Sequence, residues 1–360
     1  MLYLKKIALF QFKNYHNRDF AFTSRITGIC GKNGSGKTNL LDAIHYLCFT
    51  RSYFSRLDSL SVRQGDSGFR LAGFFELEGK EEKAVCILRE NGKKEFLVND
   101  TLYDKFSFHI GRYPCVIIAP DDIRIISNGS EERRRFIDSL LSQLDPEYLQ
   151  QLIFYNKVLQ QRNSLLKSFS ETAKPDYALL DVLDAQLVAY GTFVFEKRKD
   201  FMVSFLPAIK QQYMEIAGQY EDVTLLYESE LFSGSFAELL NASRHRDILL
   251  QRTTSGVHRD EMDIRLGKQG FKNIASQGQR KSLLFAMKLA EMKVLRASKG
   301  FAPLLLLDDV FEKLDEDRIA GLLRKVCVEN EGQVFITDTH CERLGGYLSP
   351  LRLTFETLQL

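Results

Sequence analysis

The sequence predicts an α/β fold with a mixed sheet, an antiparallel meander of strands and an inserted lobe of α-helices. First, residues 31–38 fit the pattern G-x-x-x-x-G-K-[ST] between a short apolar run and a helical pattern. Second, the aliphatic run 304–307 ends in two carboxylates, which is typical of a buried parallel strand. Third, long amphipathic helical patterns occur between residues 130 and 250. The two ends of the chain are therefore expected to form one α/β body, with the helical lobe inserted between them in the sequence.

The length also predicts two lobes, because 360 residues exceed what one hydrophobic core usually organises. We expect residues 1–125 and 250–360 to form a head, and residues 126–249 to form a mainly helical arm. The net charge of +2 excludes a general polycation, so any nucleic-acid binding must come from a local basic face. The chain has no run of about 18 apolar residues and no signal-peptide layout, which predicts a cytoplasmic protein without a membrane partner. The six cysteines occur singly, which indicates reduced, buried thiols rather than a zinc site.

The elements of the N-terminal part follow from apolar runs separated by turn residues. Residues 1–30 predict two strands and then the strand that enters the loop, and residues 39–47 predict the helix after it. Asn91 and Gly92 form a strong hairpin signal, so the next strands are expected to form an antiparallel meander. Those strands are predicted at 69–77, 84–90 and 95–98, with a further short strand at 116–119.

The middle of the chain predicts helices, and the C-terminal part returns to strands. Ser130 is expected to cap a helix whose first turn is acidic, and Asp145 with Pro146 marks the start of the next helix. Two long helical patterns separated by the polar interval 168–176 predict an antiparallel arm. Further helices are expected at 207–218, 236–250 and 276–296, and strands at 222–228, 262–266, 303–307, 333–337 and 351–355.

The glycine-rich stretch has the composition of a loop that holds the phosphates of ATP. Glycines can adopt positive φ and have no Cβ, so several backbone N–H groups can turn towards a triphosphate. Lys37 is expected to contact the β- and γ-phosphates as a catalytic residue, and the Thr38 hydroxyl to ligate Mg²⁺. A glycine-rich turn with a solvated lysine is the alternative interpretation. The expected nucleotide-binding residues here are Gly31, Lys32, Asn33, Gly34, Ser35, Gly36, Lys37, Thr38 and Asn39.

Two carboxylates stand at the end of the aliphatic strand, where an open α/β sheet binds its ligands. Asp308 is expected to hold Mg²⁺ opposite Thr38, and Asp309 to orient or deprotonate the attacking water as a second catalytic carboxylate. A simple strand end with a turn is the alternative. The upstream loop favours the catalytic interpretation.

Ser276 precedes the long helix that leads to the carboxylate strand. A serine at a helix start is most often an N-cap, but this order is also that of the signature helix in ATP-binding-cassette proteins. With the other motifs, the chain resembles the RecF family of bacterial recombination mediators, which is related to the SMC and cassette ATPases. The matching stretches span essentially the whole length. They are 12–15, 31–41, 133–138, Tyr155, 161–163, 256–260, 276–281 and 306–309.

The resemblance implies an ABC/SMC-type ATPase head with an inserted helical arm, which uses ATP and Mg²⁺. It implies a site shared by two protomers, in which Ser276 and the Gly278 backbone of one contact the γ-phosphate bound to residues 34–38 of the other. Gln277 and Gln279 complete that nucleotide-binding signature, and residues 312–315 occupy the place of the cassette D-loop. The ATPase activity is expected to be weak, stimulated by DNA and used as a switch rather than as a metabolic reaction.

The resemblance also implies the biological role and its partners. It implies an ATP-dependent homodimer that binds double-stranded DNA and single-strand/double-strand junctions. With RecO and RecR as partners, such a protein helps load the recombinase in DNA repair, replication restart and the SOS response.

Two positions depart from the cassette pattern. At the place of the glutamine sensor the chain has Ala119-Pro120-Asp121-Asp122, and Gln64 is a weak substitute. At the place of the switch histidine, Asp338 follows the strand and His340 comes two residues later. Slow ATP turnover is consistent with this incomplete set.

Several basic residues are candidates for contacts with DNA phosphates. They are Arg51, Arg56, Arg63 and the cluster Arg133 to Arg135, each with the alternative of a solvated charge or a pair with Glu131 and Glu132. The loop His258-Arg259-Asp260 is either a metal, phosphate or interface loop or a structural turn.

Two other functions stay open at this point. A nucleotide-binding subunit of a membrane transporter, or another SMC-like ATPase, has the same loop and signature, although the long arm argues against the transporter. A scaffold with a degenerate nucleotide site is the second alternative, and the intact Lys37, Thr38 and Asp308 argue against it.

Overall fold

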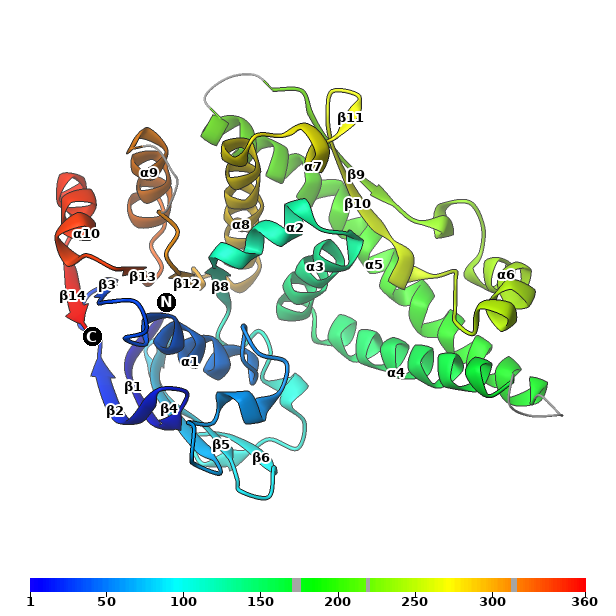
Figure 1. Ribbon diagram of the computed structural model, residues 1–360, viewed down its shortest axis with the longest axis horizontal. Coiled ribbons are helices and arrows are strands. Elements are labelled where there is room, and N and C mark those ends of the chain that lie inside the picture. The colour runs from blue at the N-terminus through cyan, green and yellow to red at the C-terminus, as the bar shows by residue number, and fades with distance from the viewer. Residues whose placement is uncertain (170–175, 218–220, 312–315) are drawn as a thin grey trace. The chain divides into compact units, whose positions relative to one another are not determined.

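The computed structural model describes residues 1–169, 176–217, 221–311 and 316–360 as two compact units (Figure 1). The first unit comprises Met1–Asp122 and Met287–Leu360, and the second comprises Ile123–Ala286. Residues 250–286, which we expected in the head, group with the helical unit. Helix α8 (Gln277–Lys299) therefore begins in the second unit and ends in the first. The assignment of functional domains to these ranges stays a prediction.

A five-stranded parallel sheet forms one layer of the first unit. Its order is β14-β3-β13-β12-β8, and every neighbouring pair is parallel. The strands β3, β8, β12 and β13 are buried along their whole length, which explains why β8 and β12 are wholly apolar and why β3 and β13 are mostly so. Their bounds are β3 (Ile26–Cys30), β8 (Cys115–Ile118), β12 (Leu304–Leu307), β13 (Val334–Asp338) and β14 (Phe355–Gln359).

A six-stranded antiparallel sheet forms another layer, in the order β2-β1-β4-β5-β6-β7. Helix α1 (Lys37–Phe49) contributes Leu40, Ile44 and Leu47 to a core that also contains apolar side chains of both sheets. The predicted α/β fold with an antiparallel meander is confirmed, with parallel and antiparallel strands divided between two sheets. The strands are β1 (Leu2–Phe12), β2 (Tyr15–Ala21), β4 (Phe69–Leu77), β5 (Lys80–Leu88), β6 (Lys94–Val98) and β7 (Thr101–Leu102).

The last edge strand lies four residues later than we expected. We predicted it at 351–355, but residues 349–351 form a 3-10 turn and β14 occupies Phe355–Gln359. The strand has only half-buried and exposed positions at the sheet edge, so it lacks the apolar run that marks the central strands. The helices that precede it are α9 (Glu316–Leu323), continued by a π-helical turn at Arg324–Val328, and α10 (Cys341–Leu348).

The second unit is mainly helical and contains one small antiparallel sheet, β11-β10-β9. The long helices α4 and α5 lie side by side, as the predicted arm requires (Figure 1). Its helices are α2 (Arg124–Ser127), α3 (Ser130–Leu144), α4 (Pro146–Ser168), α5 (Tyr177–Ala217), α6 (Phe236–Leu250) and α7 (Phe271–Ile274). Its strands are β9 (Val223–Glu228), β10 (Glu261–Leu266) and β11 (Gln269–Gly270).

Two details of the predicted helices are wrong. Helix α5 continues through Pro207, where we expected a new helix. Proline has no N–H group, so the carbonyl of Val203 loses its helical hydrogen bond. Because Val203 is 75% exposed, water can reach that carbonyl. Ser130 is the first residue of α3 rather than its cap, and the N-cap position belongs to Gly129 without a side-chain bond. Asp145 does cap α4, since its carboxylate accepts from the N–H groups of Glu147 and Tyr148.

Helix α5 is also the one helix in the described ranges that is long and apolar enough to cross a membrane by length and composition. One such helix is weak evidence, because the core helix of a folded domain passes the same test. In α5 the residues Leu183 and Leu187 are buried, as expected for a stripe that packs within the arm, whereas Leu179, which we expected in the same stripe, is exposed and its neighbour Leu180 is buried instead.

Candidate functional site

The glycine-rich loop joins the end of β3 to the start of α1. Gly34 and Gly36 adopt φ of 82° and 110°, which only glycine tolerates readily. At Gly36 a Cβ would also lie 2.6 Å from the Asn14 side-chain amide. Lys37 is 4% exposed, and its ammonium donates to the carbonyls of Gly31 (2.8 Å) and Lys32 (3.2 Å). The loop is therefore wrapped around its lysine, as a phosphate-binding loop requires.

Asn14 and Tyr15 support this loop from the start of β2. The Asn14 amide donates to the Ser35 carbonyl at 3.1 Å and accepts from the Asn39 amide at 2.7 Å. The Tyr15 hydroxyl donates to the Gly36 carbonyl at 3.0 Å. Sequence reasoning assigned these two residues no role in the site, because only folding brings β2 to a loop about twenty positions away.

Thr38 and Asp308 converge at the carboxyl end of the parallel sheet. The Thr38 hydroxyl lies 2.9 and 3.0 Å from the two carboxylate oxygens of Asp308, and the Thr337 hydroxyl donates to the same carboxylate at 2.9 Å. Burial raises the pKa of Asp308 above its ordinary value, while the bonds from Thr337 and Thr38 oppose the shift. Thr337 thus lies in this site, where we did not predict it. Its position at the end of a predicted parallel strand is the sequence feature that could have indicated it.

The oxygen pair of Thr38 and Asp308 fits a hard cation such as Mg²⁺. In the described part of the chain no group of three or more His, Cys, Asp and Glu residues could hold a metal. A cation at this pair would thus complete its shell with phosphate and water oxygens, which is how Mg²⁺ is commonly held in nucleotide sites.

Asp309 has an unusual backbone conformation next to this pair. Its φ of 43° lies in the left-handed region, and its N–H donates to the Thr337 hydroxyl at 2.9 Å. Such a conformation in a non-glycine residue carries strain and occurs often at functional sites. The same hydroxyl thus connects both carboxylate residues. The expected role of Asp309 towards water stays a prediction.

The expected sensor positions have other partners. Asp338 is buried and accepts from the Arg343 guanidinium at 2.8 Å and from the His340 N–H at 2.8 Å. The neighbouring imidazole is exposed and contacts the Thr339 hydroxyl. The two candidates for the glutamine sensor, Asp121 and Gln64, are exposed. The geometry singles out no sensor among these residues.

Ser276 and Gln279 form a capping box at the start of α8. The Gln279 N–H donates to the Ser276 hydroxyl at 3.1 Å, and the Ser276 N–H donates to the Gln279 side-chain oxygen at 2.8 Å. The ordinary interpretation of this serine is therefore observed. Ser276 and Gln277 are exposed and Gly278 is half-buried, so this helix start presents polar groups to solvent. Residues 312–315, the predicted D-loop, lie outside the described residues.

Two of the three arginines that open α3 form ion pairs within the second unit. Arg133 is buried and binds both carboxylate oxygens of Glu261, at 2.7 and 2.9 Å. Arg135 pairs with Glu131 and Glu132 on its own helix. The charge of Arg133 is thus compensated inside the protein, and Arg135 forms the helix pair that the sequence left open as the alternative to a DNA contact.

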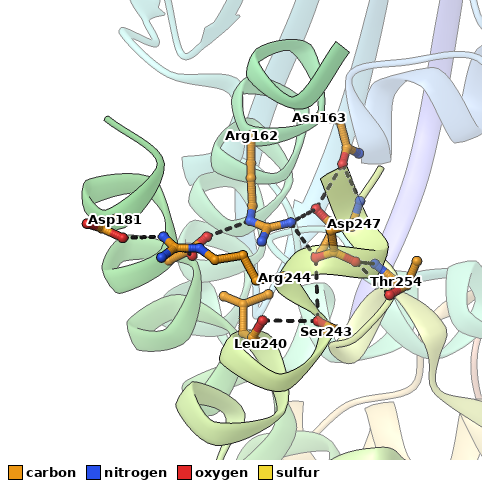
Figure 2. Close-up of polar contacts among 10 residues, drawn as sticks. Arg162, Asn163, Asp181, Leu240, Ser243, Arg244, Asp247 and Thr254 are labelled. Carbon is orange, nitrogen blue, oxygen red and sulfur yellow. Dashed lines mark hydrogen bonds and ion pairs between the residues drawn. The ribbon is translucent and has the colours of Figure 1, made fainter. Parts of the chain in front are cut away.

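Arg162 also has a structural role, which Figure 2 shows. Its side chain is fully buried and donates to Asp247 (2.7 Å), the Thr253 hydroxyl (2.8 Å) and Asp184 (2.5 Å). The Asn163 side-chain oxygen accepts from the Thr253 N–H at 2.7 Å. These bonds join α4, α5, α6 and the segment after α6. Arg162 and Asn163 therefore stabilise the helical arm.

The side chains of His258 and Asp260 have structural partners in their loop. The Tyr155 hydroxyl lies 2.6 Å from Nδ1 of His258, and Nε2 lies 3.1 Å from the Thr253 carbonyl. Burial lowers the pKa of His258 to about 4. Asp260 is buried and accepts from Arg198 and from the Tyr227 hydroxyl. A metal role of this loop finds no support, because both ring nitrogens have protein partners.

The parallel sheet, the glycine loop wrapped around Lys37 and the Thr38–Asp308 pair define a P-loop nucleotide-binding protein. Comparison with known proteins agrees, since a family profile described as an AAA domain matches residues 6–255. The DNA replication and repair protein RecF of Flavobacterium johnsoniae is 42% identical over 359 residues, with 100% of both chains covered. The RecF of Parabacteroides distasonis is 42% identical over 337 residues, 94% of this chain and 91% of its own. The chain belongs to the RecF family.

Solved structures support the same assignment. The recombination mediator protein RecF of the RecFOR pathway, in complex with ATP, is 30% identical, with a TM-score of 0.86 over 94% of this chain and 92% of its own. The Smc head domain from Pyrococcus furiosus gives a TM-score of 0.52 at 17% identity, over 94% and 90% of the two chains, and shows a shared fold. The predicted resemblance and fold class are thereby confirmed.

Proposed function

We propose that this protein is an ATP-dependent DNA-binding recombination mediator of the cytoplasm. It dimerises on ATP, binds duplex and gapped or junction DNA, and supports recombinase loading together with RecO and RecR. Its ATPase activity is weak and serves as a switch. The observation that carries the proposal is the convergence of Thr38 and Asp308 beside the loop that encloses Lys37.

Each residue of the nucleotide site has a definite task in this proposal. The loop N–H groups and Lys37 bind the β- and γ-phosphates, while Thr38 and Asp308 hold Mg²⁺. The bound Mg²⁺ neutralises charge on the phosphates. Asp309 orients the attacking water, and Thr337 holds both aspartates in place through its hydroxyl.

The exposed start of α8 supplies the second half of the site in another copy of the chain. Ser276 and the Gly278 N–H then contact the γ-phosphate, where the N-terminal end of the helix favours an anion. ATP bound between two copies stabilises the dimer by linkage, and loss of the γ-phosphate removes that stabilisation.

Sedimentation with a slowly hydrolysed ATP analogue and Mg²⁺ tests the proposal. The wild-type protein is expected to double in mass, whereas Lys37→Met and Ser276→Arg stay monomeric. Ser235→Arg is the matched control, because Ser235 forms the same kind of capping box on α6 and its loss costs a similar amount, about 1 kcal/mol. Unchanged mass at saturating nucleotide would contradict the shared site.

DNA binding is tested separately by fluorescence anisotropy with a labelled gapped duplex. Affinity is expected to require ATP and to fall steeply with salt, because phosphate contacts release counterions. Binding that does not change between low and high salt would contradict the proposal.

A further inference from the structure

A hollow of about 370 Å³ in the second unit lies where α3, α4 and the His258 loop meet. Arg134 contributes to its wall from α3, Asn156 from α4 and His258 from the loop. Arg259, next to His258, is exposed and so close that its charge lowers the pKa of that histidine, as does the charge of Arg134. Arg134 and the exposed amide of Asn156 thus line this hollow, and Arg259 adds a positive charge beside the lining residue His258.

Most other charges of the hollow are compensated within the protein. Arg198 pairs with Asp138 and Asp260, each at 2.8 Å. Arg135 pairs with Glu131, the other carboxylate of the wall. Asp138 still acts on Arg134 through its charge, as do Asp260 and Glu261, but none of these carboxylates forms an ion pair with Arg134 in the described chain.

Arg134 differs from both of its neighbours in the sequence. In the described ranges it forms no ion pair, and its one hydrogen-bond partner is the main-chain carbonyl of Asp260. Burial, with a further contribution from the charge of Arg198, lowers its pKa below the ordinary arginine value. Half-burying a guanidinium without a carboxylate is unfavourable, and an anion in the hollow would remove that cost.

His258 does not compete for such an anion. Its Nε2–H donates to the Thr253 carbonyl and its Nδ1 accepts from the Tyr155 hydroxyl, so the ring is neutral and both nitrogens are engaged. Arg134 therefore has donor capacity directed at the hollow, Arg259 adds charge, and Asn156 offers a neutral amide donor. In the described chain neither Arg259 nor Asn156 has an ion pair or a side-chain hydrogen bond.

We propose that Arg134, Arg259 and Asn156 form a binding site for a backbone phosphate of DNA. The site deepens the proposed function and rests on it. A phosphodiester carries one negative charge and acceptor oxygens only, which matches two guanidinium groups and an amide. Because such contacts read the backbone and not the bases, this site contributes affinity independent of DNA sequence.

The test measures DNA affinity of the full chain with ATP over a series of salt concentrations. Arg134→Gln and Arg259→Gln are each expected to weaken binding about 3- to 10-fold near 0.1 M salt and to reduce the salt slope of log K by about 1. Asn156→Ala is expected to weaken binding by a smaller factor without changing the slope. Arg246→Gln is the matched control, because this exposed arginine of α6 also has no ion pair among the described residues.

If Arg134→Gln lowers the stability of the protein, Arg259→Gln still tests the site. The Arg259 side chain is exposed, so its replacement disturbs no core packing. Wild-type slopes in both arginine variants, with DNA binding intact, would overturn the site but leave the proposed function standing. Absence of DNA binding by the wild-type protein would overturn both.

Titration with inorganic phosphate at constant ionic strength separates the two sources of phosphate. If phosphate binds in an Arg134-dependent manner while DNA affinity is the same in wild type and Arg134→Gln, the hollow binds the free anion and the DNA assignment is wrong. Weakening of DNA binding by the two arginine substitutions, and not by the control, supports it.

Discussion

His258 is expected to make the protein less stable in mild acid. A carbonyl oxygen can only accept, so the contact of Nε2 with the Thr253 carbonyl means that Nε2 carries the proton and that Nδ1 accepts from Tyr155. Protonation of Nδ1 would break the bond from the Tyr155 hydroxyl and place a charge beside Arg259 and Arg134. The folded protein therefore resists protonation that the unfolded chain accepts.

The size of the effect follows from the two pKa values. The folded pKa is about 4 and the ordinary value is 6.5, so the unfolded state binds the extra proton as the pH falls below 6.5. The stabilisation is fully present above pH 6.5 and is lost progressively as the pH falls towards 4. Linkage between protonation and folding gives a loss of about 1.4 kcal/mol between pH 8 and pH 5.5.

The assay is urea unfolding of wild type and His258→Gln at several pH values between 8 and 5.5. Glutamine can donate to Thr253 and accept from Tyr155 without titrating, so the free energy of unfolding of the variant should fall less in acid, by about 1.4 kcal/mol. His45 and His109, whose pKa values burial also lowers to about 4, contribute equally to both proteins and cancel.

His245→Gln serves as the control, because His245 is exposed on α6 and its replacement should leave the wild-type pH dependence unchanged. Equal pH dependence of His258→Gln and wild type would refute the buried, neutral state of His258.

Three further outcomes are expected. In differential scanning calorimetry, ATP at 100 times its Kd should stabilise the wild type by about 2.7 kcal/mol and Lys37→Met by close to nothing; equal shifts would exclude Lys37 from the site. Asp308→Asn should unfold at higher urea than wild type at pH 8 without nucleotide, because burial raises the pKa of Asp308 and makes its ionised form unfavourable. This difference should shrink as the pH falls and Asp308 becomes protonated, and a lower midpoint for the variant at pH 8 would contradict it. Arg162→Met should cost about 3–5 kcal/mol in urea unfolding, since it leaves Asp247 buried without a counter-charge, and Arg162→Met/Asp247→Leu should recover part of it. A single-variant cost below about 1 kcal/mol would contradict that assignment.

The sequence by itself was sufficient for features that depend on neighbours in the chain. The loop around Lys37 could be read because its glycines, its strand and its helix are consecutive. The central parallel strands could be predicted because burial on both faces makes their sequences mostly apolar. The edge strand at Phe355–Gln359 was misplaced because one exposed edge leaves a mixed pattern that other segments share.

Only the tertiary structure decided which polar groups act together. Thr337 joins Asp308 and Asp309 because parallel pairing aligns β12 with β13, and Asn14 reaches the phosphate loop because β2 folds back onto it. No local sequence pattern predicts that these side chains lie close together.

The arginines show the same division most clearly. In sequence, Arg133, Arg134 and Arg135 are three equal positive charges. In the structure Arg133 pairs with Glu261, 128 positions away, and Arg135 with its own helix, while Arg134 lines the hollow without a carboxylate partner in the described chain. The charge of an arginine is fixed by its chemistry, but its availability to a ligand depends on burial and on partners that only folding brings near.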